Sequence, residues 1–202
     1  LKCAHNPELK IIISNTTEVG IELVKDDIHQ SPPRSYPGKL LALLYERFKA
    51  FKGSEDSGFA IVPTELIPDN ANKLKGIILE LANLNSLEVD FIEWVEKYNY
   101  FCNSLVDRIV TGMPGEDVKK TIENELGYTD ELLTVSEVYS LWAIEGNEKI
   151  KSILSFADAD TSVVIEPDID LHRELKLRLL NGTHTLTSGL AFLANYETVL
   201  NT

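Results

Sequence analysis

The sequence has 202 residues, 44% of them hydrophobic and 25% charged, so it can bury a core of ordinary size. Its formal net charge of −13 argues against nucleic acid and against an anionic membrane surface as partners, and an anionic small molecule would need a local cationic pocket. The two cysteines, Cys3 and Cys102, form neither a disulfide framework nor a metal motif, so we expect a cytoplasmic protein.

The first third of the chain predicts an α/β pattern. The β-rich apolar run from Leu9 to Ile13 and the run FAIVP (59–63) are each typical of a buried parallel strand. Between them, three prolines in SPPRSYPG (31–38) predict a loop, and KLLALLYERFKAF (39–51) has helical spacing. The order strand, loop, helix, strand indicates a parallel sheet.

Beyond Pro68 the sequence becomes mostly helical in character. Amphipathic spacing predicts helices over 70–84, 87–101 and 116–127. Gly127 is expected to end the last of these in a left-handed conformation. SVVIEP (162–167) predicts a short strand, and the region 171–200 is helical in pattern, with interruptions possible at Gly182 and Gly189. We therefore expect two parts, 1–70 and 71–202, the second mostly helical.

Three polar side chains with different proton chemistry lie among leucines in KLRLLNGTHTL (176–186). Around an α-helix, Asn181 lies roughly 140° and His184 roughly 80° from Lys176, so all three can line one cleft. A lysine can act as a general acid or base, while an amide and an imidazole can donate hydrogen bonds to a developing oxyanion. The spacing alone favours a plainer interpretation, with an exposed lysine, a capping asparagine and a buried histidine bonded to the backbone.

Three other stretches carry candidate polar residues. SNTTE (14–18) follows the first predicted strand, where open α/β sheets bind ligands, although local capping explains it equally well. Asp107 and Arg108 interrupt an apolar run and predict either an ion pair or ligand contacts. EPDIDLHRE (166–174) could form a metal cluster, but carboxylates just before a helix are more often N-terminal capping charges, so we expect no metal.

Five runs occur together and in one order in a known family: IIISNTTEVGIEL, VPTELIPDNANKL, FCNSLVDRIVTGMP, ELGYTDELLTVSEVY and KLRLLNGTHTL. Through them, from about residue 8 to 200, the chain resembles the polyol-specific long-chain dehydrogenases, the mannitol dehydrogenase family. The resemblance implies a metal-independent, NAD-dependent oxidoreductase with a Rossmann domain followed by a largely helical substrate domain. Residues 1–70 would be the C-terminal part of that Rossmann domain, and 71–202 an incomplete helical domain.

The resemblance also implies catalytic roles. Lys176 takes the place of the family's general acid/base, and Asn181 and His184 take the places of the residues that polarise the carbonyl. Asn70 corresponds to an asparagine that approaches the reacting oxygen and binds substrate. Ala71 stands where the family has glycine, so the local backbone can differ.

Cofactor and substrate contacts follow in the same way. The residues expected near the cofactor NAD are Thr17, Glu18, Val106 and Asp107. The SNTTE and IVTG runs favour the uronate branch, so the expected reaction interconverts D-tagaturonate and D-altronate. The substrate carboxylate then needs a cation, and the candidates are Arg108, Arg178 and Lys39. Mannitol or fructuronate as substrate, a catalytically silent helical interaction module, and a monomer or a homodimer all stay open.

The family's glycine-rich strand-turn-helix, which holds the cofactor pyrophosphate, has no counterpart in the 202 residues. The resemblance therefore implies the middle of a longer enzyme, and we expect these residues alone to bind NADH poorly. Titration calorimetry of the isolated chain checks this expectation, and micromolar affinity for NADH would contradict it.

Overall fold

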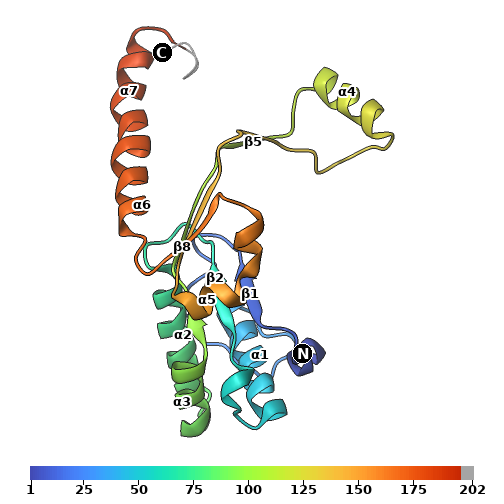
Figure 1. The fold of residues 1–202 in the computed structure, drawn as a ribbon, viewed down its shortest axis with the longest axis vertical. Coiled ribbons are helices and arrows are strands. Elements are labelled where there is room, and N and C mark those ends of the chain that lie inside the picture. Colours follow the sequence, from blue (N-terminus) through green and yellow to red (C-terminus); the bar gives the residue numbers. More distant parts are fainter. Residues whose placement is uncertain (197–202) are drawn as a thin grey trace.

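The structure is a computed structural model that describes residues 1–196, and its core is a small parallel sheet packed against helices (Figure 1). The strands of this sheet, in spatial order, are β1 (Ile11–Ser14), β2 (Ala60–Pro63) and β3 (Tyr100–Phe101). Ile11 pairs with Ala60, and Ala60 pairs with Tyr100, both in parallel register. The parallel sheet predicted from the sequence is therefore confirmed.

The helices beside this sheet share one apolar core. They are α1 (Tyr36–Phe51), α2 (Asn70–Leu84) and α3 (Val89–Tyr98). The ring of Phe91 lies edge-on to the rings of Tyr45 and Phe48, with centroids 5.2 and 5.4 Å apart. Strand β2 is buried throughout as predicted, whereas Ile13 of the edge strand β1 is 51% exposed.

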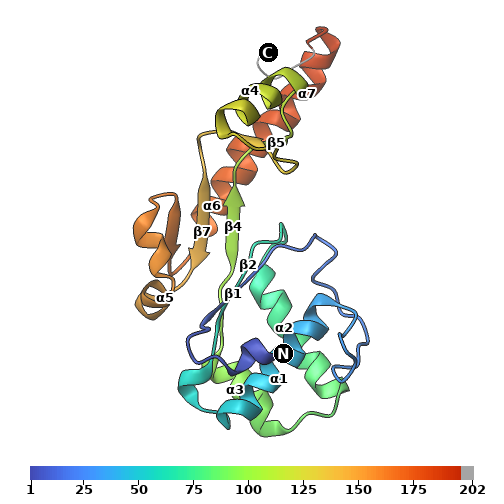
Figure 2. The same ribbon diagram turned by 90° about the vertical axis from the view of Figure 1, so that its right-hand side faces the viewer.

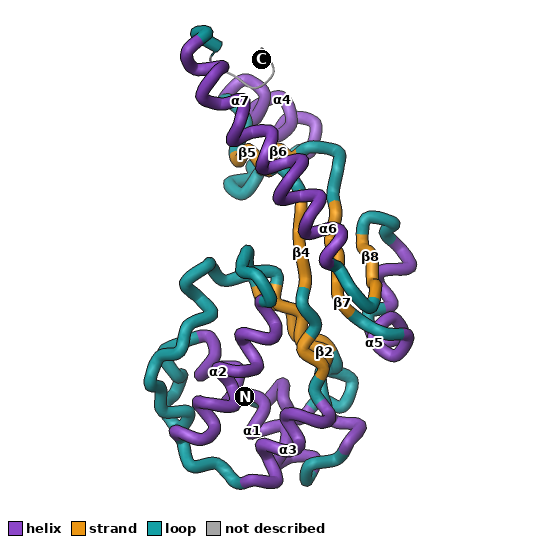
Figure 3. Tube along the Cα trace, turned by 90° about the vertical axis from the view of Figure 1, so that its left-hand side faces the viewer, coloured by secondary structure: helices purple, strands orange, loops and turns teal. Residues whose placement is uncertain are grey.

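A second sheet continues from the first through the short connection at residues 102–103. It consists of β4 (Ser104–Asp107), β7 (Leu141–Glu145) and β8 (Val163–Glu166). Strand β4 runs antiparallel to β7, and β7 runs parallel to β8 (Figure 3). The short helices α5 (Glu148–Ile153) and η3 (Ser155–Ala159) follow β7 and pack beside this sheet.

Two slender extensions leave this body (Figure 1). One is an arm made of β5 (Val110–Gly112), α4 (Glu116–Leu126) and β6 (Val135–Ser136), in which no residue of α4 is buried. The other is a continuous helical column of α6 (Asp170–Leu175), a π-helical segment η4 (Lys176–Asn181) and α7 (Gly182–Leu193) (Figure 2). None of the helices in residues 1–196 is long and apolar enough to cross a membrane.

Several boundaries differ from the predictions. The predicted helix 87–101 ends at Tyr98, and the next residues form β3 because their backbone pairs with β2. Neither Gly182 nor Gly189 interrupts the final helix, since glycine weakens a helix without forbidding it. The end of the predicted 171–200 helix, 197–200, lies outside the described residues. Gly127 ends α4 with φ +77°, as predicted.

The part beyond residue 71 contains its predicted helices, the strand β8 predicted at 162–167 and, in addition, the short strands β3–β7. These strands have two to five residues each, too short to produce a clear alternating pattern in the sequence. The predicted division at residue 70 falls at the first residue of α2, which packs in the same core as α1. That division stays a prediction.

One buried amide joins the two sheets where the site lies. The Nδ2 atom of Asn70 lies 3.0 Å from each of three carbonyl oxygens, those of Pro63, Glu65 and Ser104. Its Oδ1 atom accepts a hydrogen bond from the backbone N–H of Ser104 at 3.1 Å. The end of β2, the loop after it and the start of β4 are therefore held to the first residue of α2 by a single side chain.

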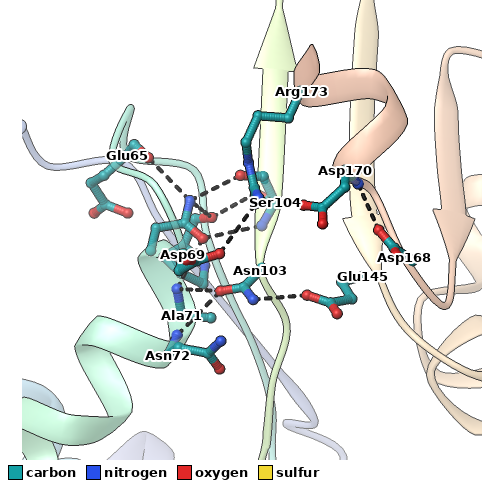
Figure 4. Close-up of polar contacts among 12 residues, drawn as sticks. Glu65, Asp69, Ala71, Asn72, Asn103, Ser104, Glu145, Asp168, Asp170 and Arg173 are labelled. Atoms are coloured by element: carbon teal, nitrogen blue, oxygen red, sulfur yellow. Dashed lines mark hydrogen bonds and ion pairs between the residues drawn. The ribbon is translucent and has the colours of Figure 1, made fainter. Parts of the chain in front are cut away.

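The neighbouring Asn103 extends this connection to the second sheet (Figure 4). Its Oδ1 atom accepts from the backbone N–H groups of Ala71 and Asn72, at 3.0 and 3.2 Å, and so caps the N-terminus of α2. Its Nδ2 atom donates to Glu145 Oε2 of β7 at 2.7 Å. The first helical turn of α2 is thus tied to both β4 and β7.

We predict that Asn70→Ala lowers the free energy of unfolding by at least about 2 kcal/mol, because each buried polar group left without a partner costs about 1–3 kcal/mol. Asn72→Ala is the matched control, since that side chain is exposed on the same turn and an exposed substitution changes stability by about 0.5 kcal/mol or less. Urea denaturation of both variants measures the difference. Equal losses would contradict the assigned role of Asn70.

A buried carboxylate organises the proline-rich loop before α1. Asp26 accepts hydrogen bonds from Ser35 N at 2.7 Å, Ser35 Oγ at 2.8 Å and Arg34 N at 3.2 Å. Ser35 in turn caps α1 by accepting from Gly38 N at 3.0 Å. Burial opposes ionisation of Asp26, but the hydrogen bonds from Ser35 and Arg34 outweigh it and hold the pKa of this carboxyl below its usual value.

A lowered pKa in the folded state means that ionised Asp26 stabilises the fold above the unfolded pKa of about 3.9, and that this contribution is lost as pH falls toward the folded pKa. We therefore expect Asp26→Asn to be less stable than the wild type by about 1–3 kcal/mol at neutral pH, with the gap narrowing below about pH 4. Denaturant titrations at several pH values measure this gap. A gap that stays constant across the range would exclude the carboxylate's charge as its cause.

Candidate functional site

Two clefts meet at Lys176. The first, of about 200 Å³, lies between the loop after β2, strand β4 and the helical column. Its lining consists of Thr64, Glu65, Leu66, Ile67, Pro68, Ser104, Leu105, Val106, Arg173, Lys176, Leu177 and Asn181. The second, of about 480 Å³, lies on the other side of Lys176, where Asp107, Glu137, Tyr139 and His172 are among its lining residues. Lys176 therefore borders both spaces.

The ammonium group of Lys176 is held by the end of strand β4. Its Nζ atom donates to the backbone carbonyl of Val106 at 2.6 Å and lies 3.5 Å from Asp107 Oδ1. The lysine side chain is 14% exposed, which differs from the exposed lysine of the plainer interpretation. The contact with the Val106 carbonyl is a hydrogen bond and the contact with Asp107 is an ion pair, so N–H donors of the ammonium remain for a ligand.

The charges of Asp107 and Arg108 do not pair with each other. Asp107 contacts Lys176, while Arg108 Nε donates to the backbone carbonyl of Glu137 at 3.1 Å. Adjacent residues of an extended segment point to opposite sides, so one faces the helical column and the other faces the arm. Asp107 is thereby placed at the site, and Arg108 lines neither cleft.

The π-helical segment brings Asn181 to the same side as Lys176. Around an α-helix these residues would lie roughly 140° apart, but a π-helix bonds residue i to i+5 and so stacks them on one face. Both line the first cleft. His184 is exposed on α7 and lines neither cleft, so the structure brings together two of the three predicted catalytic residues.

The loop after β1 is fixed by a buried carboxylate that the sequence analysis did not single out. Glu65 accepts from Ser14 Oγ at 3.0 Å, Thr16 N at 2.9 Å and Thr16 Oγ1 at 2.8 Å. This contact joins the loops that follow β1 and β2. Thr17 and Glu18 continue from the anchored Thr16, are exposed, and line neither cleft.

Tyr36 lies next to this loop, and its phenol is a neutral group at neutral pH. Burial raises the pKa of Tyr36 to about 12, and the nearby charge of Glu65 adds to the effect. Its phenol therefore stays protonated. Asn70 is also committed, because both of its polar atoms are bonded to backbone groups, and direct contact with a substrate would break one of those bonds.

None of the three cations proposed for a substrate carboxylate lines either cleft. Lys39 is exposed on α1, Arg108 faces Glu137, and Arg178 is 78% exposed and pairs with Glu174. The cleft contains a different cation, Arg173, whose Nη1 lies 2.5 Å from Asp170 Oδ1 and whose Nη2 lies 3.3 Å from Asp69 Oδ1. Its position three residues before Lys176 was the available signal, because residues i and i+3 of a helix are neighbours.

The polar side chains of the acidic stretch 166–174 bond to the start of α6 and to one another. Asp168 Oδ1 accepts from the backbone N–H of Asp170 at 2.7 Å, and His172 Nε2 lies 3.2 Å from Glu166 Oε2. Within the described residues, no group of three or more His, Cys, Asp or Glu side chains is placed to hold a metal ion.

The residues present fit one end of a dinucleotide. The loops after β1 and β2 leave the same edge of a parallel sheet, where open α/β folds bind nucleotides. Leu66, Ile67 and Pro68 give this edge an apolar surface beside Lys176, which suits a flat nicotinamide ring. In the described residues no glycine-rich turn is present to hold a pyrophosphate.

Comparison with known proteins identifies related sequences over nearly the whole chain. The model of the mannitol dehydrogenase Rossmann domain matches residues 1–155. Altronate oxidoreductase of Bacillus subtilis (strain 168) is 44% identical over 197 residues, which cover 97% of this chain and 41% of the relative. The enzyme of the same name from Escherichia coli O7:K1 is 42% identical over 200 residues, covering 98% and 41%. The chain thus spans about two fifths of the length of these relatives.

Solved structures share the fold. Pseudomonas fluorescens mannitol 2-dehydrogenase, in a ternary complex with NAD and D-mannitol, superposes with a TM-score of 0.68 at 23% identity, covering 96% of this chain and 40% of that one. A D-sorbitol dehydrogenase in substrate-free form gives 0.73 at 21% identity, covering 97% and 41%. With residues 1–155 matched by the Rossmann-domain model, the chain belongs to the mannitol dehydrogenase family.

Proposed function

We propose that the protein is an NAD-dependent oxidoreductase that interconverts D-tagaturonate and D-altronate in hexuronate catabolism. The observation that carries the proposal is the ammonium of Lys176, held at the first cleft by a hydrogen bond to the Val106 carbonyl and an ion pair with Asp107. The identity of 44% to an altronate oxidoreductase supports the choice of substrate. Because the chain spans two fifths of such relatives, the activity is assigned to the full-length protein.

Lys176 is the proton donor and acceptor in this mechanism. In reduction, its Nζ gives a proton to the ketone oxygen as that oxygen gains charge, and in oxidation the neutral amine takes the hydroxyl proton. The Val106 carbonyl and Asp107 fix the position of Nζ at the edge of the first cleft. Such fixed geometry is what makes a general acid effective.

Asn181 stabilises the oxygen from the same face of the helix. Its amide lines the cleft one π-turn beyond Lys176 and can donate a hydrogen bond to the oxygen as charge develops. His184 would join from α7 and Asn70 would hold the strand ends in register. NAD would supply or accept the hydride when bound, and the residues that would hold it are Thr17 and Glu18 in the loop after β1 and Val106 and Asp107 at the end of β4.

The second cleft gives Lys176 a separate path to solvent. After donating its proton, the amine must be reprotonated, and the first cleft is filled by substrate at that moment. Asp107 lines the second cleft and lies 3.5 Å from Nζ, so a proton can return through Asp107 Oδ1 without crossing the substrate.

We also propose a cytoplasmic enzyme that acts as a monomer or a homodimer. Cys3 is exposed and Cys102 buried, both as free thiols, which is compatible with a reducing compartment. Size-exclusion chromatography with light scattering of the full-length protein decides between the two assemblies, and a larger mass would contradict both.

For the full-length protein we expect NADH oxidation with tagaturonate, and little or none with fructuronate or fructose. Lys176→Ala should lower kcat at least about hundredfold, because general acid–base catalysis contributes about 10²–10⁴-fold. Lys151→Ala, an exposed lysine paired with Glu148, is the control and should match the wild type. Following the absorbance of NADH measures all three proteins.

Each other outcome has a definite meaning. Turnover confined to fructuronate or fructose would retain the mechanism and reassign the substrate. A folded full-length protein that turns over none of these ketones would contradict the proposal and favour a catalytically silent module.

A further inference from the structure

Because the chain is strongly acidic, an acidic substrate must be recognised by a cationic group inside the cleft. With a formal net charge of −13, these 202 residues repel an anionic sugar acid. A carboxylate must therefore meet a cation inside the cleft. Lys176 is committed to the reacting oxygen in the proposed mechanism, and the other cationic side chain in the cleft lining is that of Arg173.

On the basis of the proposed function, we infer that Arg173 binds the substrate's terminal carboxylate and so selects sugar acids over neutral ketoses. A planar guanidinium presents paired N–H donors that match the two oxygens of a carboxylate, which a lysine ammonium does not. The inference names the residue that sets the substrate class, beyond the lysine that performs the chemistry.

The spacing along the helix suits the substrate. In a hexulosonate such as tagaturonate, four carbon–carbon bonds separate the ketone carbon from the carboxylate carbon, a span of about 5 Å when the chain is extended. Residues i and i+3 of a helix have their Cβ atoms about 5–6 Å apart. Arg173 and Lys176 have this relation and line one cleft, so both side chains start within the length of one substrate molecule.

The existing partners of Arg173 leave room for another acceptor. Asp69 is 60% exposed and Asp170 is 70% exposed, whereas the Arg173 side chain is 24% exposed. Pairs with such solvated carboxylates contribute little and are readily exchanged. Each pair engages one terminal nitrogen, and an arginine carries five N–H groups, so donors remain for a ligand. Figure 4 shows the Arg173 side chain directed from α6 toward Asp69 and Ser104.

The two aspartates come from different elements. Asp69 immediately precedes α2 and has φ +50°, whereas Asp170 is the first residue of α6, so the contact with Asp69 joins the helical column to the first core. The carboxylate of Asp69 competes with the ligand's carboxylate for Arg173. Removal of the Asp69 charge is therefore expected to increase the affinity for an acidic ligand.

The experiment compares tagaturonate with tagatose, the neutral ketose that has CH₂OH in place of the carboxylate, in the full-length enzyme. Arg173→Ala should raise KM for tagaturonate about ten- to a hundredfold, as expected for loss of a hydrogen-bonded charge pair. It should leave kcat/KM for tagatose within about twofold. Where tagatose turns over too slowly, inhibition constants for altronate and the neutral altritol replace the two KM values.

Three further variants sharpen the comparison. Arg173→Lys should fall between the wild type and Arg173→Ala, because it retains the charge but not the paired donors. Asp69→Asn, whose new side chain tolerates the left-handed backbone, should lower KM for tagaturonate by removing a competing carboxylate. Arg178→Ala is the control on the outer face of the same column and should match the wild type.

Failure of this inference and failure of the proposed function are distinguishable. A wild-type enzyme that does not turn over tagaturonate would contradict the proposed function. A wild-type enzyme that does, combined with an Arg173→Ala variant that loses activity equally on acid and neutral substrates, would overturn the role of Arg173 and show that it acts only through the fold.

Discussion

The site depends on one buried amide. Asn70 holds the end of β2, the loop after it and the start of β4 together, so the cleft walls cannot separate without breaking its hydrogen bonds. Asn103 and Glu65 extend the same connection to α2, β7 and the loop after β1. A short parallel sheet with only two residues in β3 gains from this network a rigidity that its own ladder does not provide.

This rigidity matters because the chemistry is shared between two elements far apart in the sequence. Lys176 comes from the helical column, while its anchors, Val106 and Asp107, belong to the end of β4. The column contacts the rest of the molecule near its base and then extends away from it (Figure 1). Fixing β4 through Asn70 and Asn103 therefore also fixes the point at which the lysine amine is held, and a displacement of about 1 Å there is enough to reduce catalysis strongly.

Much of the fold could be predicted from the sequence, because long periodic segments and β-branched runs carry their own signal. The helices α1, α2, α3 and α4 and the strands β1, β2 and β8 lie where apolar spacing placed them. The strands of the arm, β5 and β6, and the strands β3, β4 and β7 were not predicted, since two to five extended residues pair according to tertiary context. The π-helical turn at Lys176 was also beyond sequence analysis, because its wider hydrogen-bond pattern leaves no mark in the apolar spacing.

For the site, the sequence singled out some of the residues that line the cleft, but not the residues that they contact. Lys176 and Asn181 were singled out by spacing, and their roles by resemblance, yet Arg173 and Glu65 were passed over as ordinary charges. Glu65 becomes meaningful only when the loop after β1 folds over it, and Arg173 only when Asp69 and the cleft are in place. Contacts between residues more than a hundred positions apart, such as Asp69 and Arg173, depend on the fold and not on local pattern.

The most direct test is a crystal structure of the full-length protein with altronate and NAD bound. The account predicts altronate in the cleft between β4 and the helical column, with its reacting hydroxyl about 2.7–3.1 Å from Lys176 Nζ and the Val106 carbonyl still bonded to that nitrogen. A sugar bound elsewhere, or a Lys176 side chain turned away from the reacting oxygen, would contradict it.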